Sequence, residues 1–163
     1  MKREFKLGKL TKPSADDLLG INRLLPYQAQ RPRLLSLREL KRVVSQDCIE
    51  TYVARVGGNI VGMASVIFYW VPTGLIAFIE EFTVDPNFQG RGIGSALIKK
   101  LIGRAKARRA KHISTYTNPK RIAANAVYQK LGFFKKETNF YRINLFLPKP
   151  SSKRAIKKVL GNL

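Results

Sequence analysis

The chain has 163 residues, one cysteine, one histidine and a formal net charge of +21. This length suits one domain with a buried core. The lone cysteine excludes an internal disulfide, and one Cys and one His leave too few ligands for a zinc site, so no metal is expected. No run of 18 apolar residues occurs, so no membrane span is expected. Residues 1–5 lack an apolar signal core, so we expect a cytoplasmic protein.

The positive charge is concentrated in the second half of the chain. Residues 1–85 hold 12 Lys/Arg and 9 Asp/Glu, a net charge of +3. Residues 86–163 hold 19 Lys/Arg and one acid, Glu137, a net charge of +18. One interpretation is solubility, or a host with a basic proteome. The other is contact with a polyanion such as RNA, the ribosome or an acidic membrane. Both interpretations stay open.

The first half of the chain predicts a strand, two helices and a hairpin. Ser14 is followed by two acids and predicts a helix start, and Ser36 predicts the start of a second helix. Gly57-Gly58-Asn59 is a strong signal for a tight turn between two strands. The expected elements are a strand over 4–11, a helix from Ser14 to Pro26, a helix over 37–44, and strands over 50–56 and 60–69.

The second half predicts alternating strands and helices. The expected elements are a strand over 76–84, a helix from a glycine-rich turn to about Arg109, a strand over 111–117, a helix over 121–131, and closing strands over 133–134 and 140–147. This order predicts an α/β (α+β) fold with a mixed, twisted sheet of about seven strands and helices on both faces. Residues 1–147 form the single predicted domain, and residues 148–163 a basic C-terminal tail.

The glycine-rich turn is the most informative segment. Glycines at alternate positions let the backbone approach a ligand, and free N–H groups at a helix start bind phosphate. The spacing fits neither the dinucleotide fingerprint nor the P-loop. It follows the pattern Gln-x-x-Gly-x-Gly, and the candidate residues are Gln89, Gly90, Arg91, Gly92, Ile93, Gly94 and Ser95.

This turn resembles the acyl-CoA pyrophosphate loop of the GNAT superfamily of N-acetyltransferases. A second segment, with Asn125, Tyr128 and Gly132-Phe133, looks like the last helix and following strand of that superfamily. The resemblance covers about residues 50–147. It implies a GNAT-like sheet that splays between its fourth and fifth strands, here 76–84 and 111–117. It also implies acetyl-CoA as the donor, with its arm in that gap.

The resemblance further implies roles for particular residues. The backbone N–H groups of Phe82, Thr83 and Val84 would line the donor's arm and polarise its carbonyl, as an oxyanion hole does. Tyr128 would be the acid for the departing thiolate, with plain aromatic packing as its alternative role. Asn125 would bond the amides of the arm, with an ordinary surface position as the alternative.

A base for the amine is sought among the adjacent acids Glu80 and Glu81. Alternation along a strand sends them to opposite sheet faces unless a bulge intervenes. The pair resembles the Glu-Asp of polyamine N-acetyltransferases, in which the first acid is the proposed base; this favours Glu80 over Glu81. Deprotonation through a water molecule stays open.

The predicted function is therefore transfer of an acetyl group from acetyl-CoA to a primary amine, by direct attack in a ternary complex. The acceptor is a small molecule or a protein or peptide amine. The alternative is a catalytically silent module that binds nucleic acid or another polyanion through the basic half. A monomer and a homodimer are both compatible with the sequence.

Overall fold

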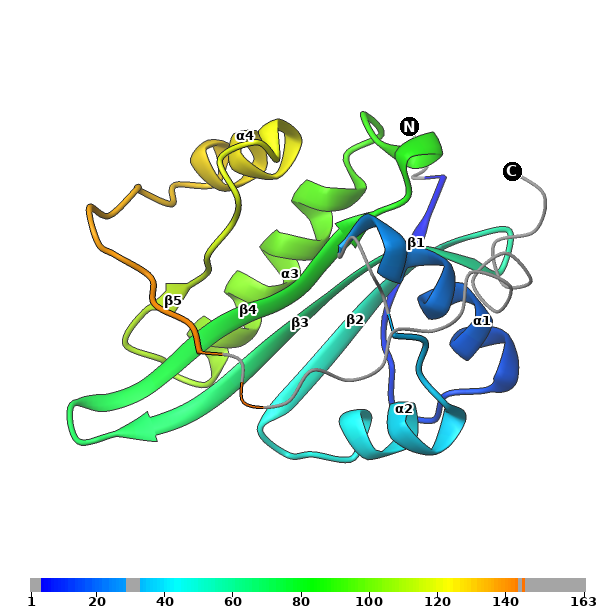
Figure 1. Cartoon of the computed structure of the whole chain (residues 1–163), viewed down its shortest axis with the longest axis horizontal. Helices are drawn as coiled ribbons and strands as arrows, with labels where there is room; N and C mark the ends of the chain where they lie inside the picture. The colour runs from blue at the N-terminus through cyan, green and yellow to red at the C-terminus, as the bar shows by residue number, and fades with distance from the viewer. Residues whose placement is uncertain (1–3, 29–32, 144, 146–163) are drawn as a thin grey trace.

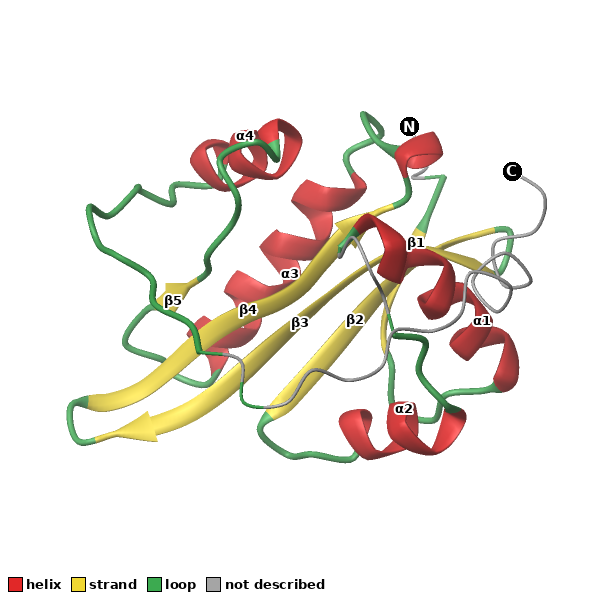
Figure 2. Ribbon diagram, in the orientation of Figure 1, coloured by secondary structure: helices red, strands yellow, loops and turns green. Residues whose placement is uncertain are grey.

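The computed structural model describes residues 4–28, 33–143 and 145. A five-stranded sheet lies between two layers of helices (Figures 1 and 2). The strands are β1 (Lys6–Lys9), β2 (Ile49–Val56), β3 (Asn59–Val71), β4 (Gly74–Val84) and β5 (Ile113–Ser114), and the helices are α1 (Ala15–Leu24), α2 (Leu37–Val44), α3 (Ile93–Ala107) and α4 (Ile122–Lys130), with short 3₁₀ turns η1 (Leu25–Tyr27) and η2 (Pro86–Phe88). No helix among these residues is long and apolar enough to cross a membrane.

The sheet is mixed and runs in the order β1-β2-β3-β4-β5. The first four strands are antiparallel neighbours, and β5 runs parallel to β4. Only two residue pairs join these last strands, Ala77 with Ile113 and Phe78 with Ser114. Beyond Phe78 the two strands separate. The α/β class, the mixed sheet and the predicted splay between the fourth and fifth strands are therefore confirmed.

Two apolar layers fix the helices on opposite faces of the sheet. On one face α1 and α2 cover a core of Leu10, Ile21, Leu24, Leu40, Val53, Ile60 and Met63. On the other face α3 and α4 cover a larger core, to which α3 contributes Ile93, Leu97, Ile98, Leu101 and Ala105. Both predicted serine caps are present as capping boxes, at Ser14 and Ser36. These caps explain why the two helices begin where they do.

The closing strands predicted over 133–134 and 140–147 are wrong over residues 133–143, which contain no strand. Residues 144, 146 and 147 and the predicted tail lie outside the described residues. α4 ends in a Schellman motif, in which Phe133 N–H donates to the Tyr128 carbonyl and Gly132 has φ of +87°. The chain then passes β5, which is only two residues long and offers almost no edge to pair with. The described part of the sheet therefore has five strands rather than about seven.

A buried carboxylate attaches the last turn of α3 to β2. The Glu50 side chain is 0% exposed and accepts hydrogen bonds from Arg104 at 2.7 and 3.0 Å and from the Tyr52 hydroxyl at 3.2 Å. Arg108 lies 2.9 Å from the same carboxylate. The hydrogen bonds from Arg104 outweigh desolvation and lower the pKa of Glu50 from 4.5 to about 2. Glu50 is thus a permanent anion inside the fold, held by two arginines whose side chains are partly exposed.

Gly94 lets the first turn of α3 lie directly on β4. A Cβ at this position would come within 3.1 Å of Phe82 Cζ and 3.7 Å of Val127 Cγ2. Gly103, two and a half turns further along the same helix, has no atom within 4 Å of the equivalent point. The close approach at Gly94 fixes the start of α3 against the end of β4.

We expect Arg104→Met to destabilise the protein by about 2–4 kcal/mol, because Glu50 then stays buried with less compensation. Urea unfolding at pH 7 measures this, with the exposed Lys106→Met on the same helix as the control, expected within about 0.5 kcal/mol of the parent. Because the pKa of Glu50 is lower in the folded state, its contribution is complete above pH 4.5 and is lost as the pH falls toward 2. An Arg104→Met loss that is unchanged at pH 3 would contradict the assignment.

Gly94→Ala and Gly103→Ala form a matched pair on α3. We expect the first to destabilise the protein by about 1–2 kcal/mol, because the new methyl group must displace the Phe82 ring. The second should stabilise it by about 0.5–1 kcal/mol through helix propensity alone. Thermal unfolding of both variants tests the contact, and equal effects in the two would show that the approach at Gly94 is not tight.

Candidate active site

A bulge in β4 brings Glu80 and Glu81 to the same side of the sheet. Ser65 of β3 pairs with Glu80 and Met63 pairs with Thr83, so two residues of β4 lie opposite one residue of β3. Glu81 has φ of +53°, an uncommon conformation for a residue with a side chain. The alternative that the sequence left open, a bulge, is therefore what the structure contains.

The positions of the flanking residues show what the bulge does. Ala77 and Ile79 before it, and Phe82 and Val84 after it, all lie in the core under α3 and α4. The side chains of the odd-numbered residues face this core before the bulge, and those of the even-numbered residues face it afterwards. Both acids consequently leave the strand on the opposite face, the one covered by α1 and α2.

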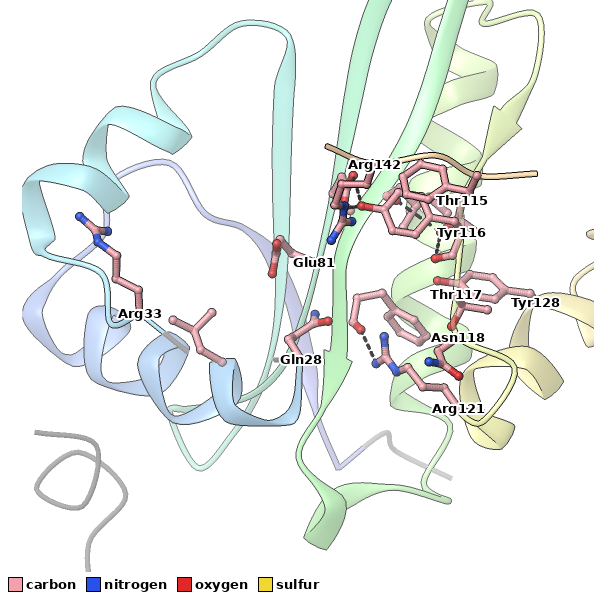
Figure 3. Close-up of a pocket in the computed structure, with 15 residues that line it drawn as sticks. Gln28, Arg33, Glu81, Thr115, Tyr116, Thr117, Asn118, Arg121, Tyr128 and Arg142 are labelled. Carbon is pink, nitrogen blue, oxygen red and sulfur yellow. Dashed lines mark hydrogen bonds between the residues drawn. The ribbon is translucent and has the colours of Figure 1, made fainter. Parts of the chain in front are cut away.

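A cleft of about 810 Å³ opens where β4 and β5 separate. Figure 3 shows Glu81 and Gln28 on the α1 side of β4, and Tyr128 and Arg121 on its α4 side. The cleft thus connects the two faces of the sheet through the splay. It is lined by Leu25, Gln28, Arg33, Ile79, Glu80, Glu81, Phe82, Thr115, Tyr116, Thr117, Asn118, Arg121, Tyr128, Phe140 and Arg142.

The two acids have different surroundings within the cleft. Water reaches Glu81, which is exposed, but the cleft walls displace much of the bulk solvent around it. This desolvation, together with the negative charge of Glu80, raises the pKa of Glu81, and Arg121 opposes the rise. Glu80 is half-buried and accepts a hydrogen bond from the Tyr116 hydroxyl at 3.2 Å. Glu81 is therefore a carboxylate whose pKa is raised, and Glu80 is the one held in position by Tyr116.

Tyr128 has the aromatic packing that was left open as its alternative role, and it also borders the cleft. It is 7% exposed, and its ring lies 5.6 Å from the Phe82 ring and 5.3 Å from the Phe133 ring. Its side chain is directed from α4 toward β4, at the wall of the cleft (Figure 3). Burial raises the pKa of the phenol, so the hydroxyl stays protonated at neutral pH. The residue packs α4 on the sheet and also lines the cleft.

The backbone of β4 directs polar groups into the gap beside β5. The Phe82 carbonyl accepts a hydrogen bond from Arg121 Nη2 at 2.9 Å, and the Val84 carbonyl accepts one from Gln89 Nε2 at 3.1 Å. In an extended strand the N–H and C=O of one residue point the same way. The N–H groups of Phe82 and Val84 therefore also face the gap. Those of the alternate residues face β3, as the bond from Asp85 N–H to the Val61 carbonyl at 2.9 Å shows.

The glycine-rich turn has the conformation that its glycines predict. Gly90 and Gly92 have φ of +76° and +79°. The first bond of the α3 helix runs from Ala96 N–H to the Gly92 carbonyl at 3.0 Å. Within the part of the chain that the structure describes, the N–H groups of residues 90–95 donate no hydrogen bond. They form a cradle of free donors at a helix start, which suits an anion.

Three predicted loop and helix residues have mainly local contacts. Gln89 ties the turn to the end of β4, and Arg91 donates to the Asn87 carbonyl at 3.3 Å. Asn125 donates to the carbonyls of Asn118 and Arg121, at 3.1 and 3.0 Å, and does not line the cleft. A contact between Asn125 and a bound donor stays a prediction.

Arg121 and Tyr116 are residues that the sequence did not assign to the site. Tyr116 follows β5, and its ring stacks on the Phe140 ring with centroids 4.7 Å apart. This contact holds the segment after α4 beside the cleft. One feature of the sequence could have indicated Arg121: a positive charge at a helix start is unfavourable unless it has a partner. Two buried polar atoms of the cleft wall, Gln28 Nε2 and Thr117 Oγ1, have no hydrogen-bond partner among the described residues. These atoms mark positions where a ligand can be bound.

Residues 18–133 match the model of the acetyltransferase (GNAT) family. An uncharacterized N-acetyltransferase of Methanocaldococcus jannaschii is 37% identical over 100 residues, which are 60% of this chain and 44% of that protein, so the match spans less than half of the relative's length. The structure of a Trypanosoma brucei acetyltransferase is 28% identical, with a TM-score of 0.71 over 86% of this chain and 99% of the other.

A predicted acetyltransferase from Clostridium acetobutylicum, crystallised with acetyl-CoA, shares the fold at 18% identity. Its TM-score is 0.68 over 86% of this chain and 96% of the other. The family match covers well over half of the chain, and it includes the bulged strand, the glycine-rich turn and Tyr128. The chain belongs to the GNAT acetyltransferase family.

Proposed function

We propose that this protein transfers the acetyl group of acetyl-CoA to a primary amine by direct attack in a ternary complex. The observation that carries the proposal is the bulge at Glu81. It puts two carboxylates on one side of a cleft whose other side holds Tyr128. An amine and a thioester can therefore meet from opposite faces of the sheet without a covalent enzyme intermediate.

The residues present fit acetyl-CoA as the donor. Free N–H groups of residues 90–95 suit its diphosphate, and the gap-facing backbone of Phe82 and Val84 suits the amides of its arm. When bound, acetyl-CoA supplies the acetyl group as an activated thioester. The backbone N–H groups of Phe82 and Val84 then polarise the carbonyl, an effect worth about 3 kcal/mol of barrier for one well-aimed donor.

Glu81 is the group we assign to proton removal from the amine. Its pKa is raised by desolvation and by Glu80, which brings the carboxylate closer to a useful base at neutral pH. Glu80, held by Tyr116, attracts the incoming ammonium group. Transfer through a water molecule in the open part of the cleft uses the same carboxylates.

Tyr128 is the group we assign to protonation of the leaving sulfur. Its phenol remains protonated because burial raises its pKa. It sits across β4 from the acids, so acid and base act on opposite sides of the reacting carbon (Figure 3).

The acceptor, small molecule or protein, stays a prediction, as do the cytoplasmic location, the oligomeric state and polyanion contact through the basic half. The silent-module alternative predicts binding of acetyl-CoA without turnover. Thiol release from acetyl-CoA over a panel of amines separates it from the enzyme. Binding without release for every amine would contradict the proposed function.

We expect Glu81→Gln to lower kcat/KM at neutral pH by about 100-fold, the size of a lost general base. Glu80→Gln should act mainly by raising KM for the amine, and Glu137→Gln, exposed and outside the cleft, should change neither. The ascending limb of the wild-type pH profile should lie above the usual range of a glutamate, because the pKa of Glu81 is raised.

Comparing variants with the same amine removes the amine's own titration from the comparison.

Tyr128→Phe should lower kcat while leaving the affinity for CoA unchanged, because the ring packing is kept. Full activity in both Glu81→Gln and Glu80→Gln would show that neither carboxylate serves the reaction.

A further inference from the structure

Arg121 is the one cationic side chain of the described cleft that reaches across from α4 to β4. It occupies the N-cap position of α4 and is half-buried. Its Nη2 donates to the Phe82 carbonyl at 2.9 Å (Figure 3). A guanidinium group at a helix start is repelled by the helix dipole. The contact must offset this repulsion and hold the charge inside the gap rather than in solvent.

The same gap is where negative charge would develop during acetyl transfer. The Phe82 carbonyl accepts the hydrogen bond from Arg121, and the Phe82 ring packs against the Tyr128 ring with centroids 5.6 Å apart. Arg121 therefore lies next to the backbone that borders the donor's arm and next to the proposed acid. No ion pair of Arg121 with a carboxylate occurs among residues 4–28, 33–143 and 145. Its charge is not neutralised by a partner at salt-bridge distance there.

We propose that Arg121 stabilises the negative charge that forms on the leaving sulfur, so that Tyr128 does not act alone. This inference rests on the proposed function. The amine nitrogen bonds to the acetyl carbon, and the carbon–sulfur bond breaks with its electron pair on sulfur. The amine proton goes to Glu81, and Tyr128 gives its proton to the sulfur before regaining one from solvent. Arg121 keeps its proton throughout and acts through its fixed positive charge.

The electrostatics of the two titrating groups agree with this placement. Desolvation is the main cause that raises the pKa of Glu81 and of Tyr128, and the charge of Arg121 lowers both. The charged and titratable groups that face this region are Glu80 and Glu81 on β4, Arg121 and Tyr128 on α4, Tyr116 after β5, Arg142 on the segment after α4, and Arg33 before α2, which pairs with Glu39. Among these cations, Arg121 is the one in contact with the β4 backbone at the gap.

A purely structural role makes a different prediction. If Arg121 only clamps α4 to β4, any side chain that keeps a hydrogen bond to Phe82 should suffice, with or without charge. If its charge matters, a charged side chain should suffice even with a poorer hydrogen bond. Arg121→Gln and Arg121→Lys separate these possibilities. Lys120→Gln is the matched control, because Lys120 is an exposed cation at the same helix start that does not line the cleft.

We expect Arg121→Gln to lower kcat by about 10- to 100-fold, Arg121→Lys to stay within about fivefold of the parent, and Lys120→Gln to stay within about twofold. In Arg121→Gln the whole pH profile should move to higher pH, because a charge that lowers the pKa of Glu81 and of Tyr128 is gone. Arg121→Lys should keep the profile in place. Equal losses in both variants without a shift in pH would overturn the proposal, and so would full activity of Arg121→Gln.

A binding measurement tests the same charge without turnover. Calorimetric titration compares CoA with desulfo-CoA, which lacks the sulfur, at pH 7 and pH 9. In the parent the preference for CoA should grow as its thiol ionises, whereas in Arg121→Gln it should stay flat. If Arg121 only holds α4 to β4, Arg121→Gln should lower the affinities for CoA and for desulfo-CoA equally, and that result would overturn the proposal.

Different results would contradict the proposed function and the role of Arg121. A parent protein that binds no acetyl-CoA, or releases no thiol with any amine, ends the proposed function. A parent protein that is active, with Arg121→Gln equal to Lys120→Gln in rate, pH profile and preference for CoA, ends only the inference about Arg121. Thermal unfolding of each variant confirms that the proteins being compared are folded.

Discussion

The bulge at Glu81 is the constraint on which the site depends. An extra residue in β4, held with φ of +53°, reverses the alternation of the strand. Before it, Ala77 and Ile79 face the core under α3, and after it Phe82 and Val84 do. Without the extra residue, one of the two acids would point into that core, and the strand end would direct different backbone groups into the gap. The backbone distortion thus sets the positions of the carboxylates and of the amides together.

Charged groups of both signs line the cleft. Glu80 and Glu81 repel one another, and Arg121 offsets part of the rise in the pKa of Glu81. At the C-terminal end of α3 the fold treats a buried anion differently, surrounding Glu50 with two arginines and a tyrosine. Glu50 is a structural anion kept charged, whereas Glu81 is left in a place where its protonation can change.

Much of the fold and part of the site were predictable from the sequence, because local chemistry determined them. Capping serines and apolar stripes specify helices through short-range contacts, and the φ angles of Gly90 and Gly92 follow from the need for glycine. The choice between a regular strand and a bulge at Glu80 and Glu81 depends on the register of β3, which a single strand does not encode. Alternation of apolar residues over 140–147 likewise indicates which side chains share a face, but it does not specify a neighbouring strand to pair with. Residues 140–143 of this segment form no strand. The contact of Arg121 joins positions 39 residues apart, beyond any spacing rule.

Phe82 connects parts of the site that are distant in the chain. Its ring supports Gly94 at the start of α3 and touches Tyr128 of α4, while its carbonyl holds Arg121. Close-packed contacts of this kind transmit displacement because they leave no free volume to absorb it. A shift of the first turn of α3 as an anion settles on it would therefore move the Phe82 ring, and with it the phenol. Under the proposed function, binding of an anion by the N–H groups of residues 90–95 would therefore be linked through Phe82 to the position of the Tyr128 hydroxyl.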